Sequence, residues 1–224
     1  MLIYTVALVG ITALVMLYRR DRVRLRNQRA QFFNRCLDLF QSYHITQEGP
    51  LFPEATARYR GYEVRLAPLI DDMAWRRVPV LWLRVTVLRS NRHKGILDLL
   101  MRPGRVEVFS PSDELHHHLT IPEGWPEQAL LCTDDPGGLA PLECITPHLA
   151  LFADPFMKEL VVAERGVRVV RMIAQSSRLH YTVFREVRFK GDVHLDPTIA
   201  ASMLDTAISI AEAVSDAPPV ERAA

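Results

Sequence analysis

The sequence predicts an α+β protein. We expect an N-terminal transmembrane helix and a helical stalk, then a mostly antiparallel sheet covered by a C-terminal helix. Three observations support this prediction: an uncharged apolar run opens the chain, alternating apolar segments occupy its middle, and an apolar helical stripe lies near its end. The 224 residues include 27 Lys and Arg against 26 Asp and Glu, and 49% are hydrophobic, which excludes a disordered or disulfide-dense chain.

The first element is a membrane anchor over residues 1–18, MLIYTVALVGITALVMLY, which carry no charged side chain. As a helix this run spans roughly 27 Å, close to the hydrocarbon thickness of about 30 Å. A cleavable signal peptide is the weaker alternative, because no basic residue precedes the run and bulky Leu17 and Tyr18 close it. A buried core helix does not explain the abrupt change to arginine that follows. We therefore expect a span.

The second element is a basic segment, residues 19–35, which we call the basic collar. It holds seven Arg and one acid, Asp21. Basic residues beside a span stay in the cytoplasm, so we expect a single-pass protein with its N-terminus outside and its globular domain cytoplasmic. Collar arginines also attract anionic membrane surfaces, the alternative to a pure topology signal. The candidate membrane-surface residues are Arg19, Arg20, Arg22, Arg24, Arg26 and Arg29.

The composition beyond the collar is different. Residues 36–224 hold 20 basic and 25 acidic residues, a formal charge of −5. Of the 27 basic residues only three are lysines, which is typical of a GC-rich bacterial genome. We therefore place the protein in a bacterial inner membrane.

The third element is a stalk over residues 19–46, in which the first helix continues to about His44. Apolar residues recur at spacings of three and four in its second half, including Phe33, Leu37 and Phe40. This stripe either packs on the globular domain or forms a protein interface, including a homodimer. Gly49 and Pro50 end the stalk.

The globular domain is expected over residues 50–216, with a disordered tail at 217–224. Strands are predicted at 55–59, 62–70, 78–88 and 106–110, and a hairpin at 165–174 and 179–189. In the strongest strand, alternation places one apolar set toward the core: Leu81, Leu83, Val85 and Val87. Helices are predicted at 92–101, at 155–164 after Asp154, and at 198–215 after Asp196 and Pro197.

The stretch 111–150 is rich in proline and glycine. Forty irregular residues are unusual inside a small domain. The stretch is therefore either a functional loop or a place where strands, such as one around 130–132, escape detection.

Motifs for catalysis are missing from the sequence, including phosphate-binding loops, dinucleotide fingerprints and the serine-hydrolase elbow. We expect no cofactor. His116 and His118 share one side of an extended chain and are candidate metal ligands, the alternative being a solvated loop edge. Cys132, Cys144 and His148 form a second metal candidate, without the paired spacing of zinc knuckles. The acidic domain does not favour nucleic acid.

The expected function is a membrane-tethered cytoplasmic interaction, assembly or regulatory module without catalytic activity. Its expected partners are the lipid bilayer and a protein in or at the membrane, and not nucleic acid. The contact surface is the stretch 111–150 or the stalk stripe. The alternatives are a membrane-anchored enzyme or metal protein that uses the His116 and His118 region, and a sensor of anionic lipid surfaces.

Overall fold

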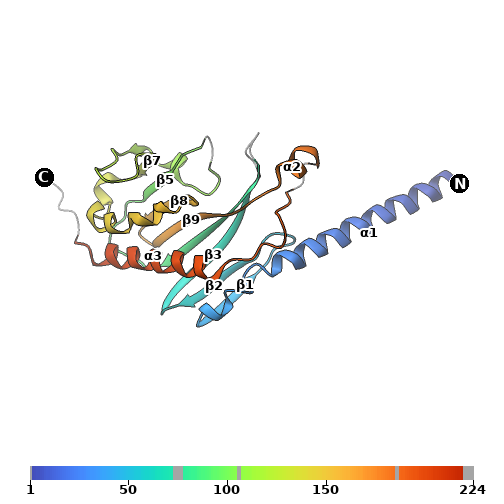
Figure 1. Ribbon diagram of the computed structural model, residues 1–224, viewed down its shortest axis with the longest axis horizontal. Helices are drawn as coiled ribbons and strands as arrows, with labels where there is room; N and C mark the ends of the chain where they lie inside the picture. Colours follow the sequence, from blue (N-terminus) through green and yellow to red (C-terminus); the bar gives the residue numbers. More distant parts are fainter. Residues whose placement is uncertain (1, 73–77, 105–106, 185–186, 219–224) are drawn as a thin grey trace.

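A nine-stranded antiparallel sheet forms the body of the molecule, and a long N-terminal helix projects away from it (Figure 1). The computed structural model describes residues 2–72, 78–104, 107–184 and 187–218. The strand order is β1-β2-β3-β4-β9-β8-β5-β7-β6. The α+β class and the antiparallel sheet are therefore confirmed.

The strands fall into an N-terminal meander and a second group inserted beside it. They are β1 (Ser42–Thr46), β2 (Glu54–Tyr59), β3 (Tyr62–Asp71), β4 (Val80–Leu88), β5 (Leu97–Met101), β6 (His117–His118), β7 (Ala129–Thr133), β8 (Met157–Ala163) and β9 (Gly166–Gln175). The α-helices are α1 (Leu2–Ala30), α2 (Arg178–Phe184) and α3 (Pro197–Asp216). Short 3-10 turns connect them at Leu37–Leu39, Ser112–Glu114, Pro136–Gly138, Leu142–Cys144 and Thr146–Ala153.

The core lies between the sheet and α3, which runs along one sheet face (Figure 1) and contacts β4 and β9. The predicted core set of β4, Leu81 to Val87 in alternation, is 0% exposed. Asp196 caps α3 as expected, because its carboxylate accepts the backbone N–H of Thr198 at 2.8 Å. The sheet covered by a C-terminal helix is thus confirmed.

The first helix is shorter than predicted, since α1 ends at Ala30 and not near His44. Beyond it the chain tightens into turns with i to i+3 hydrogen bonds, such as Cys36 N–H to Phe33 O at 2.8 Å. These turns bury Phe32, Phe33 and Phe40 in the core. Residues 42–46 then form the edge strand β1.

Two predicted helices are strands. The segment 92–101 contains β5, and the segment 155–164 contains β8. Both strands lie inside the sheet and are buried on both faces, so their apolar runs show no alternation. Asp154 closes a turn onto the N–H of Phe156 at 2.9 Å and does not cap a helix.

Of the predicted hairpin at 165–174 and 179–189, the first strand is confirmed and the second is wrong. The first strand is β9, but residues 178–184 form α2. The physical reason is that β9 already pairs with β4 on one edge and β8 on the other, so no free edge remains. The strand predicted at 106–110 includes Val106, outside the described residues, and 108–110 form no strand.

The stretch 111–150 contains β6 and β7, with one 3-10 turn before β6 and further 3-10 turns after β7. The strand considered around 130–132 is therefore confirmed as β7, which pairs with β5. At the other end of the domain, Ala217 is buried and residues 219–224 of the predicted tail lie outside the described residues.

Candidate functional site

The first half of α1 is an apolar surface exposed on all sides. From Tyr4 to Tyr18 its large side chains are between 47% and 81% exposed. Polar groups inside this stretch are satisfied locally, since the Thr12 hydroxyl donates to Leu8 O at 2.8 Å. No polar face separates the apolar side chains, unlike a surface helix of a soluble domain. The helix thus lacks a protein partner within the described chain for its apolar surface.

In the described part of the chain, one helix meets a simple length and hydropathy criterion for crossing a membrane, and it is α3. Its apolar side is packed on the sheet, so the core accounts for its composition.

Six of the seven collar arginines lie on the second half of α1, but they do not act alike. Arg22 stacks on Tyr18, with its guanidinium carbon 5.6 Å from the ring centroid. Arg24 is exposed, whereas Arg29 is 9% exposed and lies over the Phe52 ring at 5.0 Å. The collar thus divides into arginines that face solvent and arginines that face the domain.

A cavity of about 740 Å³ opens between the second half of α1 and the domain. One wall is a stripe of α1 at helical spacing: Asp21, Arg24, Leu25, Gln28 and Arg29. The opposite wall is Phe52 and the segment that precedes α3: Val187, Arg188, Phe189, Gly191, Asp192 and Val193. We call this cavity the juxtamembrane groove. Its volume is within the range of about 300 to 1,000 Å³ that small-molecule sites occupy.

Hydrogen bonds at the end of the groove where α1 meets the domain hold its two walls in place. Leu195 N–H donates to Phe32 O at 2.9 Å, and the Gln28 amide donates to Asp192 at 2.5 Å. Gln47 donates to Arg26 O at 3.0 Å from the other side of α1. These bonds fix the position at which α1 leaves the domain. The α1 stripe is therefore held opposite residues 187–193.

The histidine and cysteine candidates are only partly brought together. His118 Nδ1 lies 3.5 Å from Cys132 Sγ, across the β6 and β7 pair, and His116 is exposed before β6. Cys144 donates instead to Pro141 O at 2.8 Å. Among the described residues no three His, Cys, Asp or Glu side chains converge as a metal site. Metal binding at His116 and His118 therefore stays a sequence prediction.

The stalk stripe lies inside the molecule. Phe33 is 0% exposed and Phe40 is 9% exposed, and Leu37 packs against the same core. The rings contact the chain itself, including an edge-on contact of Phe40 with Tyr59 at 6.4 Å. The stripe therefore packs on the globular domain, which was one of the two expectations, and its side chains are not exposed for a partner.

A buried polar cluster lies on the sheet face opposite α3. It joins Asp98 of β5, Glu159 of β8 and Arg168 of β9, and both acids are 0% exposed. Ser110 donates to Asp98 at 2.9 Å, and Arg168 donates to Glu159 at 3.2 Å. Burial, reinforced by the neighbouring Glu159 carboxylate, raises the pKa of Asp98 to about 8. The cluster is a buried polar network that joins three neighbouring strands of the sheet.

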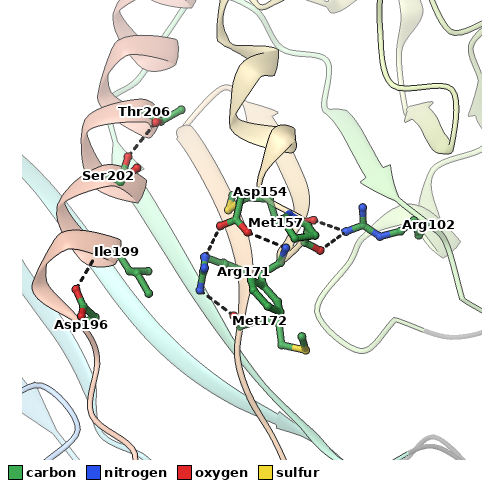
Figure 2. A network of polar contacts seen from close by, with 11 residues as sticks. Arg102, Asp154, Met157, Arg171, Met172, Asp196, Ile199, Ser202 and Thr206 are labelled. Carbon is green, nitrogen blue, oxygen red and sulfur yellow. Dashed lines mark hydrogen bonds and ion pairs between the residues drawn. The ribbon is translucent and has the colours of Figure 1, made fainter.

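A second cavity of about 270 Å³ lies between α3 and the β8 and β9 strands. Its lining includes Arg171 and Asp154, which form an ion pair at 2.7 Å, and Ser202 and Thr206 of α3. Figure 2 shows the Arg171–Asp154 pair. Arg171 also donates to Met172 O at 3.1 Å and stacks on Phe156 at 5.2 Å. Its guanidinium is therefore already engaged, and the cavity is smaller than a typical ligand site.

The juxtamembrane groove is the strongest candidate for a binding site, and no motif in the sequence predicts it. The stripe Asp21, Arg24, Leu25, Gln28 and Arg29 could have been read from the sequence, because its members recur at helical spacing. The opposite wall could not, since residues 179–189 were assigned to a strand in the sheet.

Comparisons with known proteins do not identify the chain. No protein family matches the sequence, and no curated protein matches it. Among solved structures it is similar to the mycobacterial trehalose monomycolate transport factor A, TtfA, with 10% identity and a TM-score of 0.36. That match covers 75% of this chain and 74% of the other. Similarity at this level carries no functional argument, so function is argued from this chain's own residues.

Proposed function

We propose that the chain is a single-pass membrane protein of the bacterial inner membrane whose α+β domain is a non-catalytic binding module. In this proposal the first half of α1 spans the bilayer, with its N-terminus outside. The basic collar and the domain face the cytoplasm, where the domain serves interaction, assembly or regulation. Its partners are the bilayer and a protein in or at the membrane.

The observation that carries the proposal is the exposure of α1 from Tyr4 to Tyr18 on every side. A fully exposed apolar helix in water is unfavourable by about 25 cal/mol for each Å² of apolar surface, and lipid removes that cost. A coiled-coil partner would need a single apolar stripe, which this stretch does not have. The helix then continues without a break into six arginines that favour the cytoplasmic side.

The test compares two variants with the same substitution on the same helix. Val9 and Val23 are 63% and 57% exposed, and they lie inside and beyond the uncharged run. We expect Val9→Arg to reduce the fraction of protein that resists carbonate extraction, because a charge at mid-bilayer costs about 2.5 to 3.5 kcal/mol. Val23→Arg should leave that fraction at the wild-type level.

Two results would contradict the proposal. The first is a full-length wild-type protein that remains in the supernatant of membranes without detergent. The second is an equal loss of membrane protein for Val9→Arg and Val23→Arg, which would show that arginine destabilises α1 wherever it is placed.

A further inference from the structure

The chain segment between α2 and α3 runs along α1. The Gln28 amide donates to Asp192 at 2.5 Å, and from there the groove lining extends to Asp21 on α1 and to Val187 on the opposite wall. The helix α2 ends at Phe184, three residues before Val187, and three residues span at most about 11 Å. The helix α2 therefore lies close to the Asp21 end of the groove, on the side of the domain from which α1 projects (Figure 1).

Hydrogen bonds to the neighbouring strands hold α2 in this place. Ser176, just before α2, donates its backbone N–H to Pro79 O at 2.8 Å, and the Tyr181 hydroxyl donates to Asp72 O at 3.3 Å. Pro79 directly precedes β4 and Asp72 directly follows β3. The helix is therefore attached to the end of the sheet and moves with the domain.

The helix rise gives the level of each end of the groove relative to the bilayer. Asp21 lies three residues beyond Tyr18, which is about 5 Å along α1, whereas Gln28 lies about 15 Å beyond Tyr18. The headgroup layer is about 5 to 8 Å thick on each side of the hydrocarbon core. If α1 spans the bilayer as far as Tyr18, the end of the groove beside α2 lies in the headgroup layer, and the end beside α3 lies in water.

The surface of α2 offers an apolar and a basic side chain to this layer. Leu179 is 68% exposed, the most of any large apolar side chain described beyond α1, and the others are between 42% and 53% exposed. Its neighbour Arg178 is also exposed. A single exposed leucine is common on a soluble domain, so the level of Leu179 decides its role. An aliphatic side chain beside an arginine suits the boundary between headgroups and acyl chains.

We propose that α2 is a second contact of the protein with the cytoplasmic surface of the bilayer. Leu179 enters the headgroup layer, and Arg178 donates to lipid phosphate oxygens. This inference rests on the proposed function, because it needs α1 to span the bilayer. Two attachment points fix the orientation of the domain, and β7 then lies at the end of the sheet away from the bilayer (Figure 1).

The test measures the surroundings of residue 179 in full-length protein in nanodiscs of phosphatidylcholine and phosphatidylglycerol. Leu179→Cys is labelled with a nitrobenzoxadiazole maleimide in a Cys144→Ser background, because the other native cysteines, Cys36 and Cys132, are 0% exposed. A nitroxide on the lipid headgroup quenches a label in the headgroup layer, and iodide quenches a label in water. We expect nitroxide lipids to cause a loss of fluorescence at residue 179.

Leu51→Cys, labelled in the same background, is the matched control. Leu51 is 53% exposed, and the Gln47 amide donates both to its carbonyl oxygen at 2.8 Å and to Arg26 O at 3.0 Å. Arg26 lies about 12 Å beyond Tyr18 along the helix axis, so Leu51 is on the water side of the headgroup layer. We expect iodide, and not the nitroxide lipid, to quench the label at residue 51.

A pair of charge reversals tests the role of Arg178. Arg178 and Arg58 are both exposed, but Arg58 lies on β2 and not on α2. We expect Arg178→Glu to reduce nitroxide quenching at residue 179, because a carboxylate is repelled by lipid phosphates. Arg58→Glu should leave that quenching unchanged.

Four results would overturn the inference. Iodide quenching at residue 179 equal to that at residue 51, without nitroxide quenching, would show that α2 faces water. Protection of residue 179 from both quenchers would show that protein covers it. Equal nitroxide quenching at residues 51 and 179 would show that the domain lies on the bilayer without a preferred contact. Equal losses for Arg178→Glu and Arg58→Glu would show general electrostatic attraction only.

A label at Val9 separates these results from a failure of the proposed function. Val9 is 63% exposed and lies in the middle of the uncharged run. Labelled Val9→Cys should lose fluorescence when the nitroxide is placed on the lipid acyl chain. The absence of that loss would contradict the spanning helix itself, and with it the contact by α2, whatever is measured at residue 179.

Discussion

At the scale of single residues, the two buried acids have the most unusual environment. Asp98 Oδ1 and Glu159 Oε1 have no hydrogen-bond partner among the described residues, and desolvation is the main cause that raises the pKa of both carboxyl groups. Ser110 and Arg168 act in the opposite direction but are outweighed for both. Asp98 is therefore protonated at pH values where exposed carboxyls are ionised.

This environment predicts a specific pH dependence. The pKa of Asp98 rises from 3.8 to about 8 on folding, so the folded state binds the proton more tightly than the unfolded state. Its contribution to stability is present below about pH 4 and is lost as the pH rises toward about 8. Glu159 acts in the same direction. Thermal unfolding of full-length protein in detergent should show the midpoint falling from about pH 5 to about pH 8.

Asp98→Asn should flatten this slope and raise the midpoint at the alkaline end, because the amide needs no proton to stay neutral. The exposed Asp113 offers the control, and Asp113→Asn should keep the wild-type slope. A slope for Asp98→Asn that is identical to that of the wild type would contradict the assignment of a raised pKa.

At the scale of elements, alternation along the sequence predicts strands that have one solvent-facing side. β3 and β4 alternate between buried and half-exposed residues, and both were predicted close to their observed ends. β5 and β8 are buried on both faces, and each was read as a helix. An apolar run of that length cannot be assigned by periodicity alone, because only its neighbours in the sheet decide its conformation.

The hairpin between β8 and β9 depends on a glycine for a steric reason. Gly166 has a φ of +147°, and a Cβ there would collide with the carbonyl oxygen of Val87 on β4. Gly61, in the turn between β2 and β3, also has a positive φ of +87° but has open space around its Cα. Substitution of Gly61 therefore tests backbone strain alone, whereas substitution of Gly166 tests backbone strain together with a steric clash.

We expect Gly166→Ala to lower the free energy of unfolding by about 3 kcal/mol and Gly61→Ala by about 1 kcal/mol. The measurement is chemical denaturation of the full-length protein in detergent. Equal losses of unfolding free energy for the two variants would contradict this expectation. They would show that β4 can move away from residue 166 without a cost in stability.

At the scale of the whole molecule, the uncharged and exposed stretch of α1 ends at Tyr18, and the basic collar begins at the next residue. Residues 1–18 are uncharged, the collar holds seven arginines, and residues 36–224 are formally −5. The sequence analysis identified this division because it depends on composition along one helix. It could not identify the groove, which requires the stripe on α1 to be placed against residues 187–193, more than 150 positions away.

The central claim is that α1 crosses the membrane with the collar and the domain on the cytoplasmic side. The most direct measurement is a pair of reporter fusions after Ala224, one to a fluorescent protein that is active in the cytoplasm and one to an alkaline phosphatase that is active only when exported. The account predicts a fluorescent membrane fraction and an inactive phosphatase. An active phosphatase fusion, or a fluorescent fusion found in the soluble fraction, would contradict it.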